Sequence, residues 1–229
     1  MAVSGTTTFN LDLTELVEEA FERCGAELRT GYDLKTARRS LNLLFADWAN
    51  RGINMWTIEQ GSIPLVAGTA TYSLPTDTVD LLEHVIRTGA GVAATQADLG
   101  ITRISVSTYA TIPNKLTQAR PIQVLVNRLE APSITVWPVP DNVQAYTFVY
   151  WRLRRIDDAG NGVNTMDVPF RFIPCMVAGL SYYLAMKIPG GIERLDVLKA
   201  QYDEAWQTAA DEDREKAAVR FVPRQMFIG

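Results

Sequence analysis

The residues best suited to chemistry are few and scattered in this chain. His84 is the single histidine, and it lies in a strand-like run at 81–87. A Ser-His-Asp or Cys-His site needs a nucleophile beside the imidazole, and a multi-histidine metal site needs further imidazoles. Because the sequence offers His84 no such companion, we interpret it as a structural residue.

The short motifs that mark common cofactor and metal sites are also missing. No HExxH, CxxC, GxGxxG or GxxxxGK[ST] spacing occurs, which argues against zinc, dinucleotide and P-loop chemistry. Cys24 and Cys175 both fall in apolar helical patterns, and two isolated cysteines provide neither metal-ligand spacing nor a disulfide framework. We expect two reduced, buried thiols and no cofactor.

Carboxylates on the first predicted helix leave two alternatives open. Glu18, Glu19 and Glu22 lie on its outer face. They could supply a carboxylate pair for hydrolysis, or they could be solvated helix charges.

Arginines gather toward the end of the last predicted strand. Arg152 and Arg154 share one face of that strand, so one end of the face is basic. Together with Arg155 and Arg171 nearby in sequence, they could contact DNA, an acidic partner surface or carboxylates of the same chain.

Composition is that of an ordinary globular protein. Of 229 residues, 47% are hydrophobic and 21% are charged, which fits neither global disorder nor a membrane protein. The formal net charge of −4 argues against tight, sequence-independent DNA binding, because that affinity depends on Lys and Arg contacts to phosphates. Residues 1–10 contain no basic region followed by an apolar run, so we expect no signal peptide and synthesis in the cytoplasm.

The uncharged segment 173–186 is the element that the others must surround. Its apolar residues recur at helical spacing and also occupy the remaining faces, which predicts a helix buried all round. Pro174 fits the first helical turn. At about 1.5 Å per residue the helix is roughly 21 Å long, short of the ~30 Å hydrocarbon core of a membrane. We therefore expect it to be the centre of a soluble core.

Three amphipathic helices are predicted around this segment. The first begins at Asp12 with Glu15 completing a capping box, and Gly25 ends it. The second runs from near Asp33 to Gly52, and the last covers about 193–217.

Between the helices the hydrophobic period changes to that of strands. Strand-like runs occupy 55–67, 70–74, 79–87, 122–126, 133–137 and 145–156. Residues 88–101 are rich in Gly and Ala and are predicted to be an exposed loop, and a short helix is predicted after Ser105.

These elements predict an α+β fold. A helical bundle formed by 1–54 and 157–218 carries a large antiparallel β-rich insertion at 55–156, followed by an extended C-terminal tail at 219–229.

The tail has an unusual composition for a solvated terminus, with two arginines, no acid and several apolar side chains. Burying Phe221 and Phe227 would contribute roughly 2 to 3 kcal/mol each, whereas fixing the backbone of 219–229 costs on the order of 11 to 20 kcal/mol. An ordered tail therefore needs main-chain hydrogen bonds or a preformed groove, on its own domain or on a partner.

Several short patterns match a known family. They are Trp48-Ala49-Asn50-Arg51-Gly52-Ile53, Tyr109 with Pro113-Asn114-Lys115, Arg120-Pro121, and Trp137-Pro138-Val139-Pro140-Asp141. In this order and between amphipathic helices, they make the chain resemble, over nearly its whole length, the head-to-tail adaptor proteins (portal-proximal connectors) of short-tailed bacteriophages. Ala119 departs from the pattern, which would place glycine before Arg120-Pro121.

The resemblance implies a non-enzymatic virion protein, synthesised in the host cytoplasm. It would form a ring, typically a dodecamer, that lies beneath the portal, extends the DNA channel and carries the tail. Its implied partners are the portal protein, a downstream tail or nozzle protein, and double-stranded DNA that passes without specific binding. No membrane is involved.

The resemblance also suggests contact residues by their position in the chain. Arg152 and Arg154 are candidates for intersubunit or channel-facing contacts. The candidates for binding the portal are Phe221, Pro223, Arg224, Met226 and Phe227.

Three alternatives remain open at this point. The ring could lie further down, as a tail-tube component. The protein could be a virion cell-wall hydrolase that uses carboxylates, or a DNA-binding module that uses Arg152 and Arg154.

Overall fold

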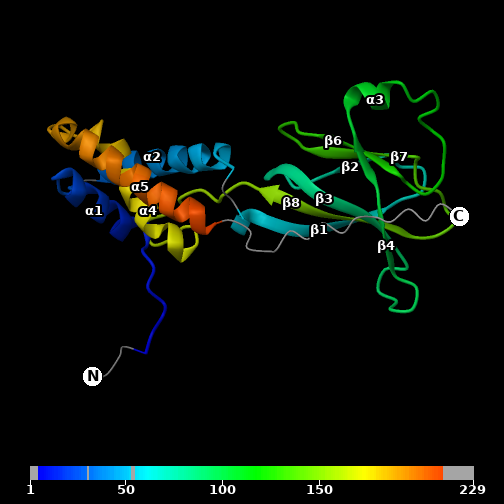
Figure 1. The fold of residues 1–229 in the computed structure, drawn as a ribbon, viewed down its shortest axis with the longest axis horizontal. Helices are drawn as coiled ribbons and strands as arrows, with labels where there is room; N and C mark the ends of the chain where they lie inside the picture. The colour runs from blue at the N-terminus through cyan, green and yellow to red at the C-terminus, as the bar shows by residue number, and fades with distance from the viewer. Residues whose placement is uncertain (1–4, 30, 53–54, 214–229) are drawn as a thin grey trace, which may run out of the picture. The chain divides into compact units, whose positions relative to one another are not determined.

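The computed structural model describes residues 5–29, 31–52 and 55–213. The chain divides into two compact units, Met1–Met55 with Asp158–Gly229, and Trp56–Asp157. We call them the helical unit and the β unit. Four helices pack together in the first and two four-stranded sheets form the second, so the predicted α+β class is confirmed (Figure 1).

Helix α1 (Leu13–Cys24) has both predicted end signals. The Asp12 side chain accepts a hydrogen bond from the Glu15 backbone, and the Glu15 side chain accepts one from the Asp12 backbone, which completes the capping box. Gly25 ends the helix at φ 78°, a left-handed conformation that glycine adopts without penalty.

Helix α2 (Gly31–Asn50) starts and ends two residues earlier than predicted. Its buried face is polar only at Ser40. That face consists of Ala37, Ser40, Leu41, Leu44, Phe45 and Trp48.

Helix α4 (Ile173–Ala185) is the buried centre of the helical unit, as predicted, and packs against α1, α2 and α5. It follows a short 3-10 helix, η2 (Phe170–Phe172), with Pro174 in its first turn. A Cβ atom at Gly179 would lie 2.8 Å from a methyl carbon of Leu44 and 2.9 Å from the ring of Tyr202, so glycine permits this close packing. Met186 is 51% exposed, and the inclusion of this residue in the buried helix was wrong.

Helix α5 (Leu195–Glu212) follows a 3-10 helix, η3 (Gly191–Arg194), and buries Leu198, Tyr202 and Ala209. The prediction continued this helix to 217, and residues 214–217 lie outside the described ranges.

The β unit contains two sheets with strand orders β1-β8-β3-β4 and β2-β7-β6-β5. After η1 (Met55–Thr57), the strands are β1 (Ile58–Leu65), β2 (Thr71–Ser73), β3 (Thr78–Thr88), β4 (Ala97–Gly100), β5 (Thr102–Ile104), β6 (Gln123–Asn127), β7 (Ser133–Trp137) and β8 (Tyr146–Arg154). One hydrophobic core joins the two sheets, because Ile86 and Phe148 of the first and Val124 and Val136 of the second belong to the same buried cluster.

Two details of this unit differ from the sequence prediction. The predicted loop 88–101 contains β4, which pairs antiparallel with β3 and aligns Arg87 with Asp98. Strand β5 pairs with β6 in parallel, so the otherwise antiparallel insertion contains one parallel ladder. The predicted short helix is confirmed as α3 (Val106–Ala110), and Ser105 caps it.

Candidate functional site

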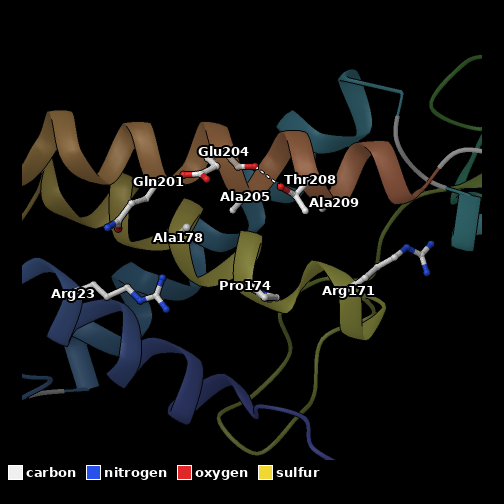
Figure 2. A pocket seen from close by; sticks show the side chains of 9 residues that line it. All are labelled: Arg23, Arg171, Pro174, Ala178, Gln201, Glu204, Ala205, Thr208 and Ala209. Atoms are coloured by element: carbon white, nitrogen blue, oxygen red, sulfur yellow. Dashed lines mark hydrogen bonds between the residues drawn. The ribbon is translucent and has the colours of Figure 1, made fainter.

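Two of the grooves on the helical unit adjoin each other. The first, which we call the α4–α5 groove, has a volume of about 560 Å³ and is shown in Figure 2. The second, the α1–α4 groove, has a volume of about 440 Å³. Arg23 and Pro174 line both, so the grooves adjoin where α1 and the start of α4 meet.

Small side chains create the α4–α5 groove. Ala178 on α4 and Ala205 and Ala209 on α5 leave space that larger residues would fill. Figure 2 shows the lining residues on three helices and the segment before α4, with Arg23 on α1 and with Arg171 at one end, its side chain extending away from the others. The remaining lining residues are Pro174, Gln201, Glu204 and Thr208.

Both arginines of the α4–α5 groove are already paired. The Nε atom of Arg23 lies 2.8 Å from a carboxylate oxygen of Glu19. Arg171 donates to Asp213, whose side chain is fully buried and also accepts a bond from the Met55 backbone N–H at 3.3 Å. With its arginines neutralised by partners and several small side chains, this groove suits packing against another protein segment.

The α1–α4 groove combines an apolar floor with an acidic rim. Phe9, Leu11, Ile173, Pro174 and Val177 form the floor. The rim carries Glu15, Glu18, Glu19 and Glu22, with Arg23 beside them.

The four rim carboxylates are not equivalent. Glu15 completes the helix cap and Glu19 pairs with Arg23. Glu18 and Glu22 are exposed, and neither has an ion-pair partner within the described residues. The predicted acidic face of α1 is therefore one wall of a groove, and two of its charges are uncompensated.

The structure pairs the two strand arginines with carboxylates of their own chain. Arg152 donates to Asp77 at 2.7 Å, to Glu59 at 2.9 Å and to the Thr78 hydroxyl at 3.0 Å. Arg154 donates to the other oxygen of Glu59 at 2.7 Å. Hydrogen bonding from Arg152 is the main reason that the pKa of Asp77 is lowered. The sequence left open DNA, an acidic partner surface and carboxylates of the same chain as partners of these arginines. The structure contains pairs with carboxylates of the same chain.

His84 lies on β3 with its ring stacked on Phe148 at a centroid distance of 6.0 Å. Both ring nitrogens are buried, and neither has a hydrogen-bond partner in the described part of the chain. Burial lowers the pKa of His84, and the positive charge of Arg103 acts in the same direction, while Glu83 opposes it. The imidazole thus packs as an aromatic ring within the β unit.

The two cysteines are free and buried, as predicted. The Cys24 thiol lies 3.2 Å from the Ser181 carbonyl oxygen, to which it donates. Burial raises the pKa of both thiols, that of Cys175 to about 12.

Residues from the family-like patterns make specific contacts. The Trp137 indole donates to the Asn114 carbonyl at 3.0 Å, and the Lys115 ammonium lies 5.5 Å from the centre of the Tyr109 ring. In the helical unit, the Arg51 guanidinium lies 4.8 Å from the Trp206 ring. These patterns therefore hold chain segments together within each unit.

The five residues predicted to bind the portal fall outside the described residues. They are Phe221, Pro223, Arg224, Met226 and Phe227. The grooves, in contrast, were missed by sequence reasoning. The sequence contained one indication of them. Ala205 and Ala209 lie four residues apart on a face of α5 whose other residues are large.

Within the described ranges, no cluster of three or more His, Cys, Asp or Glu side chains could hold a metal ion. In the same part of the chain, none of the helices combines the length and the apolar character that crossing a bilayer requires.

The helical unit thus offers grooves suited to contact with other protein segments, while the strand arginines are paired within the chain. The sequence model of one family, described as SU10 adaptor protein, matches residues 11–224, and the chain belongs to that family. No curated protein matches the chain. Membership implies the structural role of a phage adaptor or connector, and it favours this role over the carboxylate hydrolase.

Proposed function

We propose that the protein is a head-to-tail adaptor of a phage virion. It forms a ring below the portal, extends the DNA channel and joins the tail to the capsid. The observation that carries this proposal is the adaptor-family match across residues 11–224, which covers nearly all of both units. The two adjoining grooves described above support it, because an adaptor must contact several neighbours.

In this proposal each part of the chain has its own task. The helical domain, 1–54 and 157–218, builds the ring and carries the β-rich insertion at 55–156. The tail, 219–229, engages the portal through its apolar side chains and arginines. A closed ring presents many tails at once, so individually weak contacts gain strength through effective concentration.

The ring is a dodecamer with the portal protein on one side and a tail or nozzle protein on the other. Double-stranded DNA passes through it during packaging and ejection without specific binding. The net charge of −4 supports this, because strong phosphate binding would slow the DNA. Arg152 and Arg154 remain the candidates for contact with a neighbouring subunit or with the channel, and the Glu59 carboxylate paired with both weakens their attraction for phosphates.

Deletion of 219–229 tests the proposal. The full chain should attach to portal-containing particles and form a ring visible by negative-stain electron microscopy. The truncated chain should keep the same far-ultraviolet circular dichroism spectrum but fail to attach. Normal attachment of the truncated chain would contradict the assignment of the tail.

Mass measurement provides the second test. The mass of the chain with and without portal gives the number of subunits in the ring and shows whether the portal triggers assembly. Rings that form on tail tubes and not on portals would favour the tail-tube component instead.

A further inference from the structure

The α1–α4 groove has the features of a surface that another segment covers. Its floor contains Phe9, which is 66% exposed although it contacts the Phe170 ring at a centroid distance of 6.4 Å. Its rim carries Glu18 and Glu22, four residues apart on the same helical face, where like charges repel. A suitable occupant brings apolar side chains together with positive charge.

The chain itself contains such a segment beyond the described residues. Residues 219–229 include Arg220 and Arg224, no acid, and the large apolar side chains of Phe221, Met226 and Phe227. Their charge is opposite to that of the rim, and their side chains match the floor.

The tail starts close enough to reach its own groove. Asp213, the last described residue, is held by Arg171, and Arg171 is three residues before Pro174 in the groove floor. Phe221 is eight residues after Asp213, which allows a reach of up to about 26 to 29 Å. The rim from Glu15 to Glu22 is only about 10 Å long at the helical rise.

We propose that the α1–α4 groove is the docking site of the chain's own C-terminal segment, 219–229. Phe221 and Phe227 cover the apolar floor, while Arg220 and Arg224 lie beside Glu18 and Glu22. Because the contact is intramolecular, a weak intrinsic affinity is sufficient. This docking takes place in the isolated chain and needs no portal. A further consequence, that the portal and the groove compete for the same tail, rests on the proposed function.

Photo-cross-linking of the full chain tests the docking without any portal. Benzoylphenylalanine replaces Phe221 in one variant and Phe227 in another, and the cross-linked peptides are identified by mass spectrometry. Cross-links should fall on 9–23 and 173–177. Mixing ¹⁵N-labelled with unlabelled chains distinguishes contacts within one chain from contacts between two.

Charge reversal provides the matched control. Glu18→Lys with Glu22→Lys should lower the cross-link yield about fivefold or more. Glu130→Lys with Glu193→Lys makes the same change in net charge on exposed residues that do not line the groove, and it should leave the yield unchanged. Circular dichroism establishes that all variants are folded.

Three results would overturn the proposal. They are cross-links that map elsewhere or do not form, products that contain one labelled and one unlabelled chain, and a yield that the Glu18 and Glu22 reversal does not lower. A failure of portal attachment in the earlier test would leave the docking result unaffected.

Discussion

The indole N–H of Trp48 donates a hydrogen bond to the phenolic oxygen of Tyr202 at 3.0 Å, and both side chains are buried. This bond connects α2 with α5 across the centre of the helical unit. The Trp48 ring also contacts Phe172 and Trp206, each at a centroid distance of 5.5 Å. Burial strongly raises the pKa of Tyr202, so the phenol stays neutral and accepts the bond over the whole working range of pH.

Tyr202→Phe should destabilise the helical unit by about 1 to 3 kcal/mol, because it leaves the buried indole N–H without an acceptor. Urea unfolding followed by tryptophan fluorescence measures the change. Tyr182→Phe is the control, since the Tyr182 ring stacks on Tyr202 at 6.2 Å but its hydroxyl has no bond among the described residues. The control should change stability by less than about 0.5 kcal/mol. Equal effects would show that the hydrogen bond does not matter.

Leu180→Asp should abolish folding of the helical unit. Leu180 is fully buried in α4, where an unpaired carboxylate has no hydrogen-bond partner, and we expect a cost above about 4 kcal/mol. Soluble yield and circular dichroism measure the outcome. Leu43→Asp makes the same change at a residue of α2 that is 55% exposed, and it should be tolerated. A folded Leu180→Asp protein would mean that α4 is not the centre of the core.

Arg152→Met should destabilise the β unit by about 1 to 3 kcal/mol at pH 7, less than for a fully buried pair because Asp77 and Glu59 keep part of their hydration. The Asp77 and Glu59 side chains are 44% and 45% exposed. Urea unfolding of both proteins measures the difference in the free energy of unfolding.

The pH dependence of this difference follows from Asp77. Its pKa is lowered from 3.8 in the folded state, so the pairing stabilises the fold above that value and is lost as the pH falls through the folded pKa. The difference in the free energy of unfolding between wild type and Arg152→Met should therefore become smaller below about pH 4. Arg87→Met, which breaks an exposed cross-strand pair with Asp98, should have a much smaller effect. A gap that stays constant to pH 2 would contradict this account.

His84→Phe should make the stability of the β unit less sensitive to pH. The folded state lowers the pKa of His84 from 6.5, so the unfolded chain binds its proton first and wild-type stability falls as the pH drops below that value. Phenylalanine keeps the stacking on Phe148 and removes the titration. Since His84 is the single histidine, urea midpoints at pH 7.5, 6.5 and 5.5 isolate its effect. Parallel pH profiles for the two proteins would refute the prediction.

Local signals in the sequence predicted both ends of α1 correctly. The capping box of Asp12 and Glu15 and the stop at Gly25 each depend on residues within one helical turn, and both are present in the structure. The buried character of α4 was equally readable, because its lack of charge leaves no face for solvent.

Features that depend on distant partners could not be predicted. The residues of β4 have little β propensity of their own. They form a strand by pairing with β3, and the Arg87–Asp98 ion pair at 2.7 Å connects the two strands. The parallel direction of β5 against β6 leaves no trace in either segment.

The candidate sites show the same limit. Arg152 was recognisable as part of a basic strand end, but its partners Asp77 and Glu59 lie 75 and 93 residues earlier in the chain. The grooves arise from small residues and carboxylates on three different helices, so their full lining follows only from the packing of α1, α4 and α5.

The discontinuous helical unit has a consequence for the order of events during synthesis. The β unit is one continuous segment and has all its strands once residue 157 has left the ribosome. Helices α1 and α2 emerge first but must wait for α4 and α5, and α5 ends at Glu212. At about 5 to 20 residues per second, the apolar faces of α1 and α2 stay uncovered for roughly 8 to 30 s after α2 is complete. The β unit is therefore complete before the helical unit, although the helical unit contains the first residues of the chain.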